Sequence, residues 1–250
     1  MKKFEIVTHC WNYWRCLTLQ LSSLYLDPPK ETEVLISVCH TEEDAATTGR
    51  LHLFGELDWP GNVTLNPVPM KKEELWRRAI GRNMCALRTE ADWVWFADCD
   101  MIFYGEAIDR LMSLDLLQDD ASKMVYPRYV MATSQERGDE IIYELGDDWS
   151  DLKLTLPDMK GEDWFRKNYR AAIGGSQCVD GRVCREKGYL NNHPKWQKPT
   201  NRWRRTYEDP VFRSQCIGHK GKTIKNTTVC TGIGRIRHTK RGRFDIGLEM

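Results

Sequence analysis

Short apolar runs recur at intervals through the first hundred residues of the chain. Lys3–Thr8, Val34–Cys39 and Trp93–Ala97 have the length and apolar content of strands buried on both faces of a parallel sheet. Asn62–Asn66 is expected to form a further, shorter strand. The chain therefore begins with four predicted strands, each separated from the next by a polar or amphipathic stretch.

The three intervening stretches have the residue spacing of helices. In the first, one apolar face is formed by residues three or four positions apart, namely Trp14, Leu17, Leu21 and Leu24. Asp27-Pro28-Pro29 ends this helix, because proline cannot continue it. Residues 42–57 are predicted to be helical, and Lys71–Arg88 is rich in strong helix formers. Alternation of strand and helix predicts an α/β fold with a doubly wound, mostly parallel sheet flanked by helices.

The second half of the chain is less regular. Lys123–Val130 is predicted to be a strand, and Asp209–Ile217 is predicted to be a helix. Residues 134–170 are polar with interspersed aromatic residues, which indicates a lid or an insertion rather than core. The texture changes near residue 120 without a linker, so we interpret the two parts as halves of one domain.

The composition is typical of a globular chain. Hydrophobic residues make up 41% of the sequence and charged residues 29%, which excludes wholesale disorder. No apolar run is long enough to cross a bilayer, and the N-terminus runs into a strand-like segment rather than a signal peptide. The nine cysteines are scattered without a C-x-x-C pair, which indicates reduced, buried thiols. We therefore expect a cytoplasmic protein, in the host cytoplasm if the chain is viral.

Positive charge is concentrated near the C-terminus. The whole chain has a net charge of +1, yet Gly181–Arg243 holds 17 Lys or Arg residues against three acidic ones. A solvated basic face is the ordinary meaning of such a cluster. An asymmetry this large also favours a polyanionic partner, either nucleotide phosphates or a nucleic acid.

Asp98-Cys99-Asp100 is the first candidate for chemistry. It follows Trp93–Ala97 directly, so it is expected at the carboxyl end of a strand, where doubly wound sheets bind ligands. Hard divalent cations prefer oxygen ligands, and two neighbouring carboxylates would hold such an ion. A pair of acidic residues that caps the next helix is the alternative, and the pattern alone leaves both open.

Glu208-Asp209 is the second candidate. It follows the basic, aromatic segment Trp203–Tyr207 and precedes Pro210. One of these carboxylates would serve as a general base that takes the proton of a hydroxyl group. Both would also be favourable at a helix N-terminus, and the two interpretations are compatible.

Other residues complete the candidate site. His238 lies among cations that would keep its imidazole neutral and able to ligate a metal. Gly174-Gly175 predicts a tight, closely approached backbone segment, and Thr8-His9 follows the first strand at the same edge. Gly81-Arg82-Asn83 places a glycine inside a helix, which indicates close packing or ligand approach. A turn or a surface position is the plainer interpretation for these residues.

Together these segments resemble the GT-A glycosyltransferases, and among them the large inverting family whose members carry D-x-D and E-D motifs. The matching segments occur in the family's order along the chain: Ile6-Val7-Thr8, Arg78-Ala79-Ile80-Gly81-Arg82-Asn83, Phe96-Ala97-Asp98-Cys99-Asp100, Gly174-Gly175 and Tyr207-Glu208-Asp209. The resemblance implies one GT-A domain over residues 1–250. Its nucleotide-sugar-binding half would span residues 1–120, and its irregular acceptor-binding and catalytic half would span residues 121–250. Residues 131–170 match nothing in the family's pattern.

The resemblance also implies roles for the candidate residues. Asp98 would contact the donor ribose or the metal, and Asp100 would ligate a Mn²⁺ or Mg²⁺ that bridges the diphosphate of a nucleotide sugar, with a UDP-sugar favoured. His238 would be a further metal ligand. Asp209, or else Glu208, would be the base in a transfer with inversion, although retaining relatives use a carboxylate in this region differently. Further donor contacts would come from Thr8, His9, Arg82, Asn83, Gly174 and Gly175.

The nucleobase and the acceptor are left open. In the family the second strand ends in an acidic pair that reads the base, whereas here it runs into Cys39–Asp44. Arg182–Arg243, with Trp196, Trp203 and Tyr207, favours DNA as acceptor, because cations track a phosphate backbone and aromatic rings stack on bases. Some phage enzymes glycosylate hydroxymethylated pyrimidines in DNA, and such a base would be the acceptor. A glycan such as a surface polysaccharide is the alternative acceptor.

Two other classes of protein compete with a transferase. A non-catalytic nucleic-acid-binding module would use the acidic pairs only as helix caps, and it would bind without turnover. A nucleotidyltransferase shares strand-end aspartates and a metal, but the chain has no Gly-rich, Lys-containing phosphate loop near its N-terminus.

Overall fold

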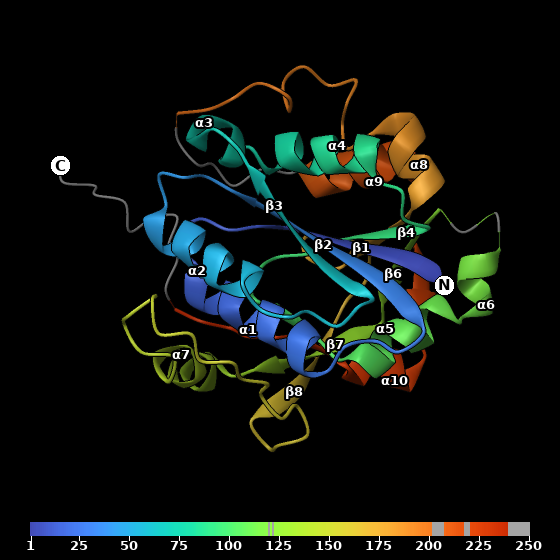
Figure 1. Ribbon diagram of the computed structural model, residues 1–250. Helices are drawn as coiled ribbons and strands as arrows, with labels where there is room; N and C mark the ends of the chain where they lie inside the picture. The colour runs from blue at the N-terminus through green and yellow to red at the C-terminus, as the bar shows by residue number, and fades with distance from the viewer. Residues whose placement is uncertain (120, 122, 202–207, 218–220, 240–250) are drawn as a thin grey trace.

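The computed structural model describes residues 1–119, 121, 123–201, 208–217 and 221–239, and it is built around one large sheet (Figure 1). In this part of the chain the sheet has seven strands in the order β10-β6-β9-β4-β1-β2-β3, and only β9 runs antiparallel to its neighbours. The strands are β1 (Lys2–His9), β2 (Thr32–His40), β3 (Val63–Pro69), β4 (Trp93–Phe96), β6 (Met124–Pro127), β9 (Gln177–Asp180) and β10 (Lys222–Ile224). The predicted mostly parallel sheet is confirmed.

A second, smaller sheet lies beside the large one in the order β5-β11-β7-β8. Its strands are β5 (Met101–Phe103), β7 (Tyr129–Thr133), β8 (Trp164–Asn168) and β11 (Ile233–Arg235). The single strand predicted over Lys123–Val130 is wrong, because the chain changes sheets at Arg128. The amide of Arg128 donates to Ile224 of the large sheet, and its carbonyl accepts from the amide of Tyr169, which follows β8.

Helices cover both faces of the large sheet (Figure 1). One face carries α1 (Trp14–Leu26), α2 (Ala45–Gly55) and α5 (Gly105–Met112), and the other carries α3 (Lys72–Leu75), α4 (Arg78–Arg88), α8 (Gly181–Lys187) and α9 (Glu208–Ile217). Three leucines of the predicted apolar face of α1 pack into the same core as Ile6 of β1 and Ile36 of β2. The remaining helices are α6 (Asp115–Gln118), α7 (Gln135–Tyr143) and α10 (Thr227–Thr231).

The long helix predicted over Lys71–Arg88 is instead two helices, α3 and α4. The chain bends at Arg77, whose φ of −106° and ψ of 83° are not helical. Trp76 packs edge-to-face on Trp11 with 5.8 Å between ring centroids, and Arg77 lies over the ring of Trp196. These contacts offset the loss of helical hydrogen bonds and let α4 begin at Arg78.

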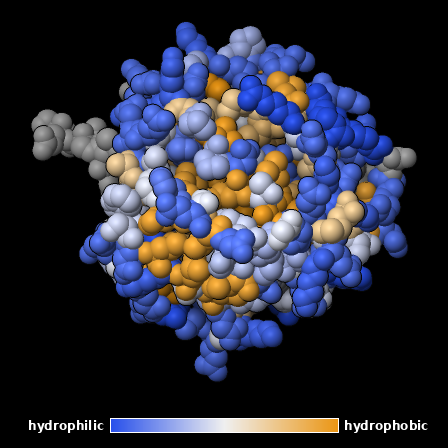
Figure 2. Space-filling model, viewed as in Figure 1, coloured by the Kyte–Doolittle hydropathy of each residue, from blue (hydrophilic) through white to orange (hydrophobic). Residues whose placement is uncertain are grey.

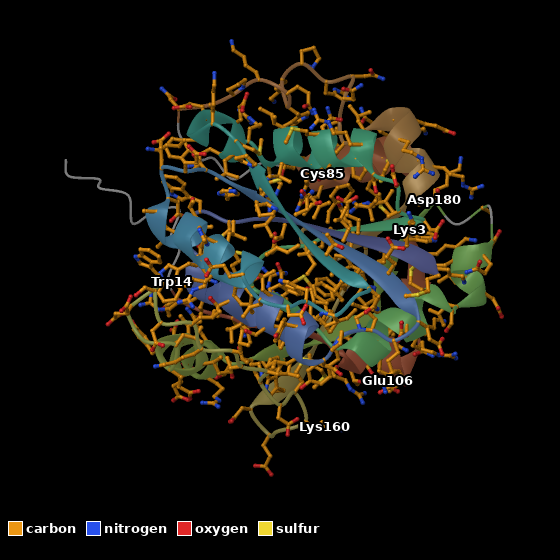
Figure 3. All side chains as sticks on the ribbon, viewed as in Figure 1. Lys3, Trp14, Cys85, Glu106, Lys160 and Asp180 are labelled. Carbon is orange, nitrogen blue, oxygen red and sulfur yellow. The ribbon has the colours of Figure 1, made fainter. Side chains whose placement is uncertain are left out.

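The segment 134–170, predicted to be a lid or an insertion, contributes to the core. Ile141 and Ile142 of α7 and Trp164 of β8 pack in a cluster with Ile236. The interspersed aromatic and aliphatic residues are therefore an amphipathic pattern that the sequence interpretation overlooked. Lys160 lies on the loop that projects away from the large sheet (Figure 3).

All nine cysteines are buried and none forms a disulfide, as their scattered positions predicted. Figure 3 shows Cys85 on the side of α4 that faces the strands. Within the described ranges, no helix combines the length and the apolar character needed to cross a membrane.

Gly81 gives a test of the packing between α4 and β1. A β-carbon at this position would collide with Nε2 of His9 and come within 2.8 Å of Sγ of Cys39. We expect Gly81→Ala to lower the free energy of unfolding by about 1–3 kcal/mol, because overpacking outweighs the gain in helix propensity. Gly55→Ala, where a β-carbon meets nothing within 4 Å, is the control and should be neutral or stabilising by up to about 1 kcal/mol. Urea denaturation would measure both, and an unchanged or higher stability of Gly81→Ala would contradict this packing.

Candidate active site

Four acidic residues and three arginines meet beyond the carboxyl end of β4. Two of the acids follow β4 directly, and the other two open α9. Two arginines come from α4 and the third from β11. We call this group the charge cluster, and its members are Asp98, Asp100, Glu208, Asp209, Arg78, Arg82 and Arg235.

Arg78 and Arg82 join the two acidic motifs. They are four residues apart on α4, so their side chains leave the same face of the helix one turn apart. Nη1 of Arg78 donates to Oδ1 of Asp98 at 3.2 Å, and its Nε lies 3.0 Å from Oε1 of Glu208. Nη1 of Arg82 donates to Oδ1 of Asp209 at 2.7 Å, while its Nη2 lies 4.0 Å from Oδ1 of Asp98. The D-x-D and E-D motifs therefore share their counterions.

Asp209 is held in its ionised form. Its Oδ1 also accepts a hydrogen bond from the Tyr189 hydroxyl at 2.8 Å. Burial raises the pKa of this carboxyl, but Arg82, Arg78 and the Tyr189 hydroxyl outweigh burial, so the pKa lies below its ordinary value. The Glu208 side chain is only 1% exposed, against 12% for that of Asp209. Asp209 is thus the more accessible of the two candidate bases.

Arg235 binds both aspartates of the D-x-D motif. β11 pairs with β5 so that Arg235 lies opposite Met101, and the amide of Ile236 donates to the carbonyl of Asp100 at 2.8 Å. This pairing places Nη2 of Arg235 3.2 Å from Oδ2 of Asp98 and 3.1 Å from Oδ2 of Asp100. The charges of Asp100 and Asp98 raise the pKa of the guanidinium in spite of its burial.

Gly174 and Gly175 form the closely approached segment that the sequence predicted. Gly174 has a φ of +50°, a conformation that side chains other than glycine rarely adopt. A β-carbon on Gly175 would come within 2.8 Å of the backbone nitrogen of Asp98 and 3.1 Å of its Oδ2. The indole of Trp95 donates to the carbonyl of Gly175 at 2.6 Å. The two glycines therefore let the backbone lie directly against the first aspartate.

The other predicted donor contacts fall into two groups. Thr8 and His9 are buried at the end of β1, and the ring of His9 packs where Gly81 lacks a side chain. Asn83 is engaged with the segment after α8: its Oδ1 accepts from the amide of Tyr189, and its amide donates to Asn191. Asn83 thereby orients the tyrosine that contacts the E-D motif.

The three predicted metal ligands are not gathered in this structure. His238 packs edge-to-face on Tyr13, with 5.2 Å between the ring centroids. Over the described ranges, no three His, Cys, Asp or Glu side chains lie close enough together to hold an ion. Asp98 and Asp100 do share a side, because both direct Oδ2 to Arg235.

Asp44, the last acidic residue of the segment after β2, forms hydrogen bonds with nearby parts of the chain. Asp44 caps α2 by accepting from the amide of Thr47, and its Oδ2 also accepts from the amide of Asn12 at 2.6 Å. The last acid of this segment is therefore taken up by two backbone amides and by the hydroxyl of Thr47.

Four residues of the site were not found from the sequence. Arg78 had a local signal, because it and Arg82 are spaced one helical turn apart on a strong helix pattern. Tyr189, Lys167 and Arg235 had none, since they reach the charge cluster through strand pairing and loop packing between distant segments. Trp196, expected as a stacking platform for bases, is instead buried, and Trp203 and Tyr207 lie outside the described residues.

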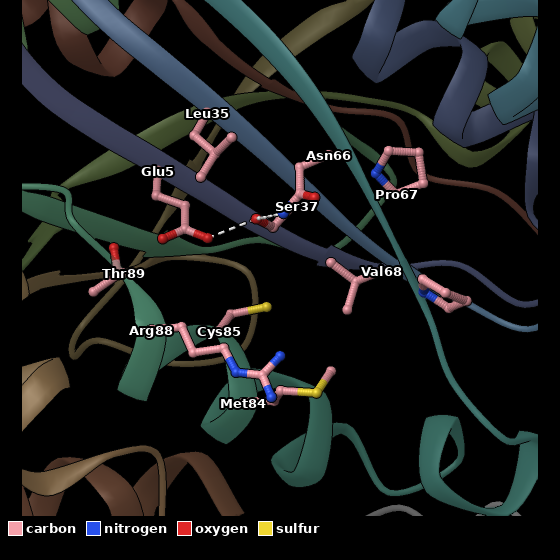
Figure 4. Close-up of a pocket in the computed structure, with 11 residues that line it drawn as sticks. Glu5, Leu35, Ser37, Asn66, Pro67, Val68, Met84, Cys85, Arg88 and Thr89 are labelled. Carbon is pink, nitrogen blue, oxygen red and sulfur yellow. Dashed lines mark hydrogen bonds between the residues drawn. The ribbon is translucent and has the colours of Figure 1, made fainter.

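A hollow lies at the other half of α4 from the charge cluster, between this helix and strands β1 to β3 (Figure 4). Its volume is about 390 Å³, and apolar side chains gather in the middle of this face in Figure 2. Glu5 lies in its floor, where the Ser37 hydroxyl donates to Oε1 at 2.6 Å and Thr89 also lines the hollow. Burial raises the pKa of the Glu5 carboxyl.

The chain is similar to known proteins in its fold, but no similarity was found in comparisons of its sequence. No protein-family model and no curated protein matches the chain. Among solved structures, it is similar to the mannosyltransferase PcManGT from Pyrobaculum calidifontis in complex with GDP-Man and Mn²⁺, with a TM-score of 0.57, 13% identity, and coverage of 96% of this chain and 58% of that one. It is also similar to residues 1–349 of TarS from S. aureus in complex with UDP-GlcNAc, with a TM-score of 0.55, 12% identity, and coverage of 99% and 62%.

These similarities define the class of fold. The chain has the mixed α/β architecture of these two solved structures, with a large, mostly parallel sheet flanked by helices. It spans about six tenths of the length of these two structures.

Asp209 should stabilise the protein in a pH-dependent manner. Because its pKa is lower in the folded state, its contribution is full above the ordinary value of 3.8 and is lost as the pH falls through the folded-state pKa. We expect Asp209→Asn to lower the free energy of unfolding at pH 7 by about 1–3 kcal/mol. Below pH 3.8 the difference from the parent should shrink. Denaturation curves across pH would show this, and a difference that grew in acid would contradict the pairing.

The contribution of Glu5 to the stability of the protein should have the opposite dependence on pH. A carboxyl whose pKa is raised on folding makes the native state less stable as the pH rises from its ordinary value of 4.5 towards the folded-state pKa. Glu5→Gln should therefore stabilise the protein at pH 7 by about 1–3 kcal/mol and leave it unchanged in acid. Loss of stability at pH 7 would show that the ionised carboxylate is satisfied in the folded state.

Proposed function

We propose that this chain is a metal-dependent glycosyltransferase that moves a sugar from a nucleotide-diphosphate sugar to an acceptor hydroxyl, with inversion. The observation that carries the proposal is the charge cluster, in which D-x-D at the end of β4 and E-D at the start of α9 share Arg78 and Arg82. It occurs in a fold whose solved examples include complexes with UDP-GlcNAc and with GDP-Man and Mn²⁺.

The donor set of Asp98 and Asp100 suits Mn²⁺ or Mg²⁺. Oδ1 of Asp100 is buried without a hydrogen-bond partner among the described residues. Oδ2 of Asp98 and Oδ2 of Asp100 converge on the guanidinium of Arg235. Ions of this kind are commonly held by one or two carboxylates together with substrate phosphates, so two protein ligands suffice. His238, whose Nδ1 is also buried without a described partner, is the candidate third ligand. When bound, the ion would offset the charge that develops on the leaving diphosphate.

The remaining cluster residues would position the two substrates. Thr8, His9 and Arg82 would border the donor, and Gly174-Gly175 would let its sugar approach Asp98. Asn83 would act through Tyr189, whose loop it holds.

Asp209 is the proposed base. Arg82 and Tyr189 donate to its Oδ1, whereas Oδ2 lies 3.9 Å from Nη2 of Arg78. Oδ2 would accept the proton of the acceptor hydroxyl, a contribution of about 10²–10⁴-fold to the rate. Glu208, more deeply buried and paired with Arg78, would orient that arginine.

For the acceptor we propose a hydroxymethylated pyrimidine in DNA. The support is the excess of basic residues in Arg182–Arg243, and the burial of Trp196 removes one of the three aromatic residues expected to stack on bases. Steeply salt-dependent binding to duplex DNA would support this acceptor, and no retention on DNA at low salt would direct the search to a glycan. A non-catalytic module would bind DNA and show no response to nucleotide sugars.

Thermal unfolding with a panel of nucleotide sugars tests the proposed function. At about 100 times its dissociation constant, the correct donor should stabilise the protein by about 2.7 kcal/mol, and only with Mn²⁺ or Mg²⁺ present. Asp100→Asn should abolish this stabilisation, whereas the exposed control Asp58→Asn should retain it. Asp209→Asn should keep donor binding and lose transfer by about 10²-fold or more. Full donor stabilisation of Asp100→Asn would refute its assignment as a ligand.

A further inference from the structure

Arg235 contacts the same two carboxylates that would hold a metal ion at the D-x-D motif. Its guanidinium bridges Oδ2 of Asp98 and Oδ2 of Asp100, the two carboxylates proposed to bind the ion. A cation from the chain and a cation from solution would therefore compete for the same oxygen atoms. We propose that Arg235 is an exchangeable counterion, which holds the two aspartates in the metal-free protein and moves to the donor diphosphate when metal and donor bind. This inference rests on the proposed function.

Exposure and partners distinguish Arg235 from the other two arginines. Its side chain is 23% exposed, against 15% for Arg78 and 0% for Arg82. Arg78 and Arg82 are also anchored by Glu208 and Asp209, which a metal at the D-x-D motif would not displace. Both carboxylate partners of Arg235 are the ones that the metal would take.

Lys167 provides a reason for Arg235 to move towards an anion. Lys167 lies on β8, and its pKa is lowered by burial and by the charge of Arg235, with a smaller contribution from Arg237. The aspartates now offset this repulsion between two cations. Once a metal ion binds the aspartates, they no longer offset the repulsion between Arg235 and Lys167, and a diphosphate bound near both cations would restore the balance.

The count of charges leads to the same conclusion. The charge cluster has four carboxylates and three guanidinium groups, one negative charge in excess. A divalent cation alone would leave the cluster positive, and a diphosphate alone would make it more negative. The two together change its charge little, so we expect each to bind weakly alone and strongly with the other.

Binding of Mn²⁺ to Arg235→Gln tests this exchange directly. Electron paramagnetic resonance would measure the affinity for Mn²⁺ without nucleotide, and calorimetry would measure the affinity for UDP and GDP at saturating Mn²⁺. We expect Arg235→Gln to bind Mn²⁺ alone at least tenfold more tightly than the parent, because a competing cation is gone. The same variant should bind the preferred nucleotide at least tenfold more weakly.

Arg237→Gln is the matched control. It removes the same charge two residues away, and its guanidinium lies over the ring of Phe165 instead of the aspartates. Both of its affinities should stay within about twofold of the parent, since solvent and salt screen the charge of an exposed side chain. Arg235→Lys keeps the charge but cannot bridge two carboxylates, and it should also bind Mn²⁺ alone more tightly. It serves as the test if Arg235→Gln does not fold.

The exchange requires that the affinities of Arg235→Gln for Mn²⁺ and for nucleotide change in opposite directions. A residue that merely maintains the fold would weaken both affinities when it is removed, and that result would overturn the exchange. Unchanged Mn²⁺ affinity in both Arg235 variants would overturn it as well. If the parent itself binds no Mn²⁺ with either nucleotide, both the exchange and the proposed metal dependence fail. If the parent binds both and transfers sugar while the variants show no opposed change, only the exchange fails.

Discussion

The sharing of Arg78 and Arg82 between two acidic motifs is the interaction on which the rest of the site depends. Removing one partner of a buried ion pair costs about 3–5 kcal/mol, because the other charge is left without compensation. The D-x-D and E-D carboxylates can therefore be buried together only while α4 presents both arginines to them. The bend before Arg78 serves this requirement, since it sets where α4 begins and which face it turns to the strand ends.

The surroundings of each carboxyl decide its charge. Asp209 and Glu5 are both buried, yet the pKa of Asp209 is lowered by two guanidinium groups while that of Glu5 is raised by burial. The arginines of the charge cluster thus favour the ionised form of Asp209, which suits a proton acceptor, whereas burial in the hollow at the other half of α4 makes ionisation of Glu5 less favourable. Two sites on one helix are in this way suited to different chemistry.

Much of the fold could be predicted because its first half is regular. Buried parallel strands are continuous apolar runs and α1 has a clear apolar face, so β1, β2 and β4 were found within about two residues of their bounds. The prediction failed where distant contacts override local pattern. Pairing of Arg128 with both sheets divides one apolar run into β6 and β7, and aromatic packing at Trp76 divides one helix into two.

The candidate site likewise has residues that the sequence predicts and residues that it does not. Its acidic motifs are local signals, and the structure brings Asp98 close to Asp209 through shared arginines. Arg235 and Tyr189 could not be predicted, because only the pairing of β11 with β5 and the packing of the loop after α8 bring them there. The ring of His238, the expected third ligand, packs on Tyr13, and its role at a metal stays a prediction.

A crystal structure of the full chain with Mn²⁺ and a bound nucleoside diphosphate would test the central claim most directly, because anomalous scattering locates manganese unambiguously. The account predicts a manganese peak between the carboxylates of Asp98 and Asp100, with the diphosphate on its open side and Arg78 and Arg82 still paired with Glu208 and Asp209. A nucleotide bound elsewhere, or a manganese peak away from both aspartates, would contradict it.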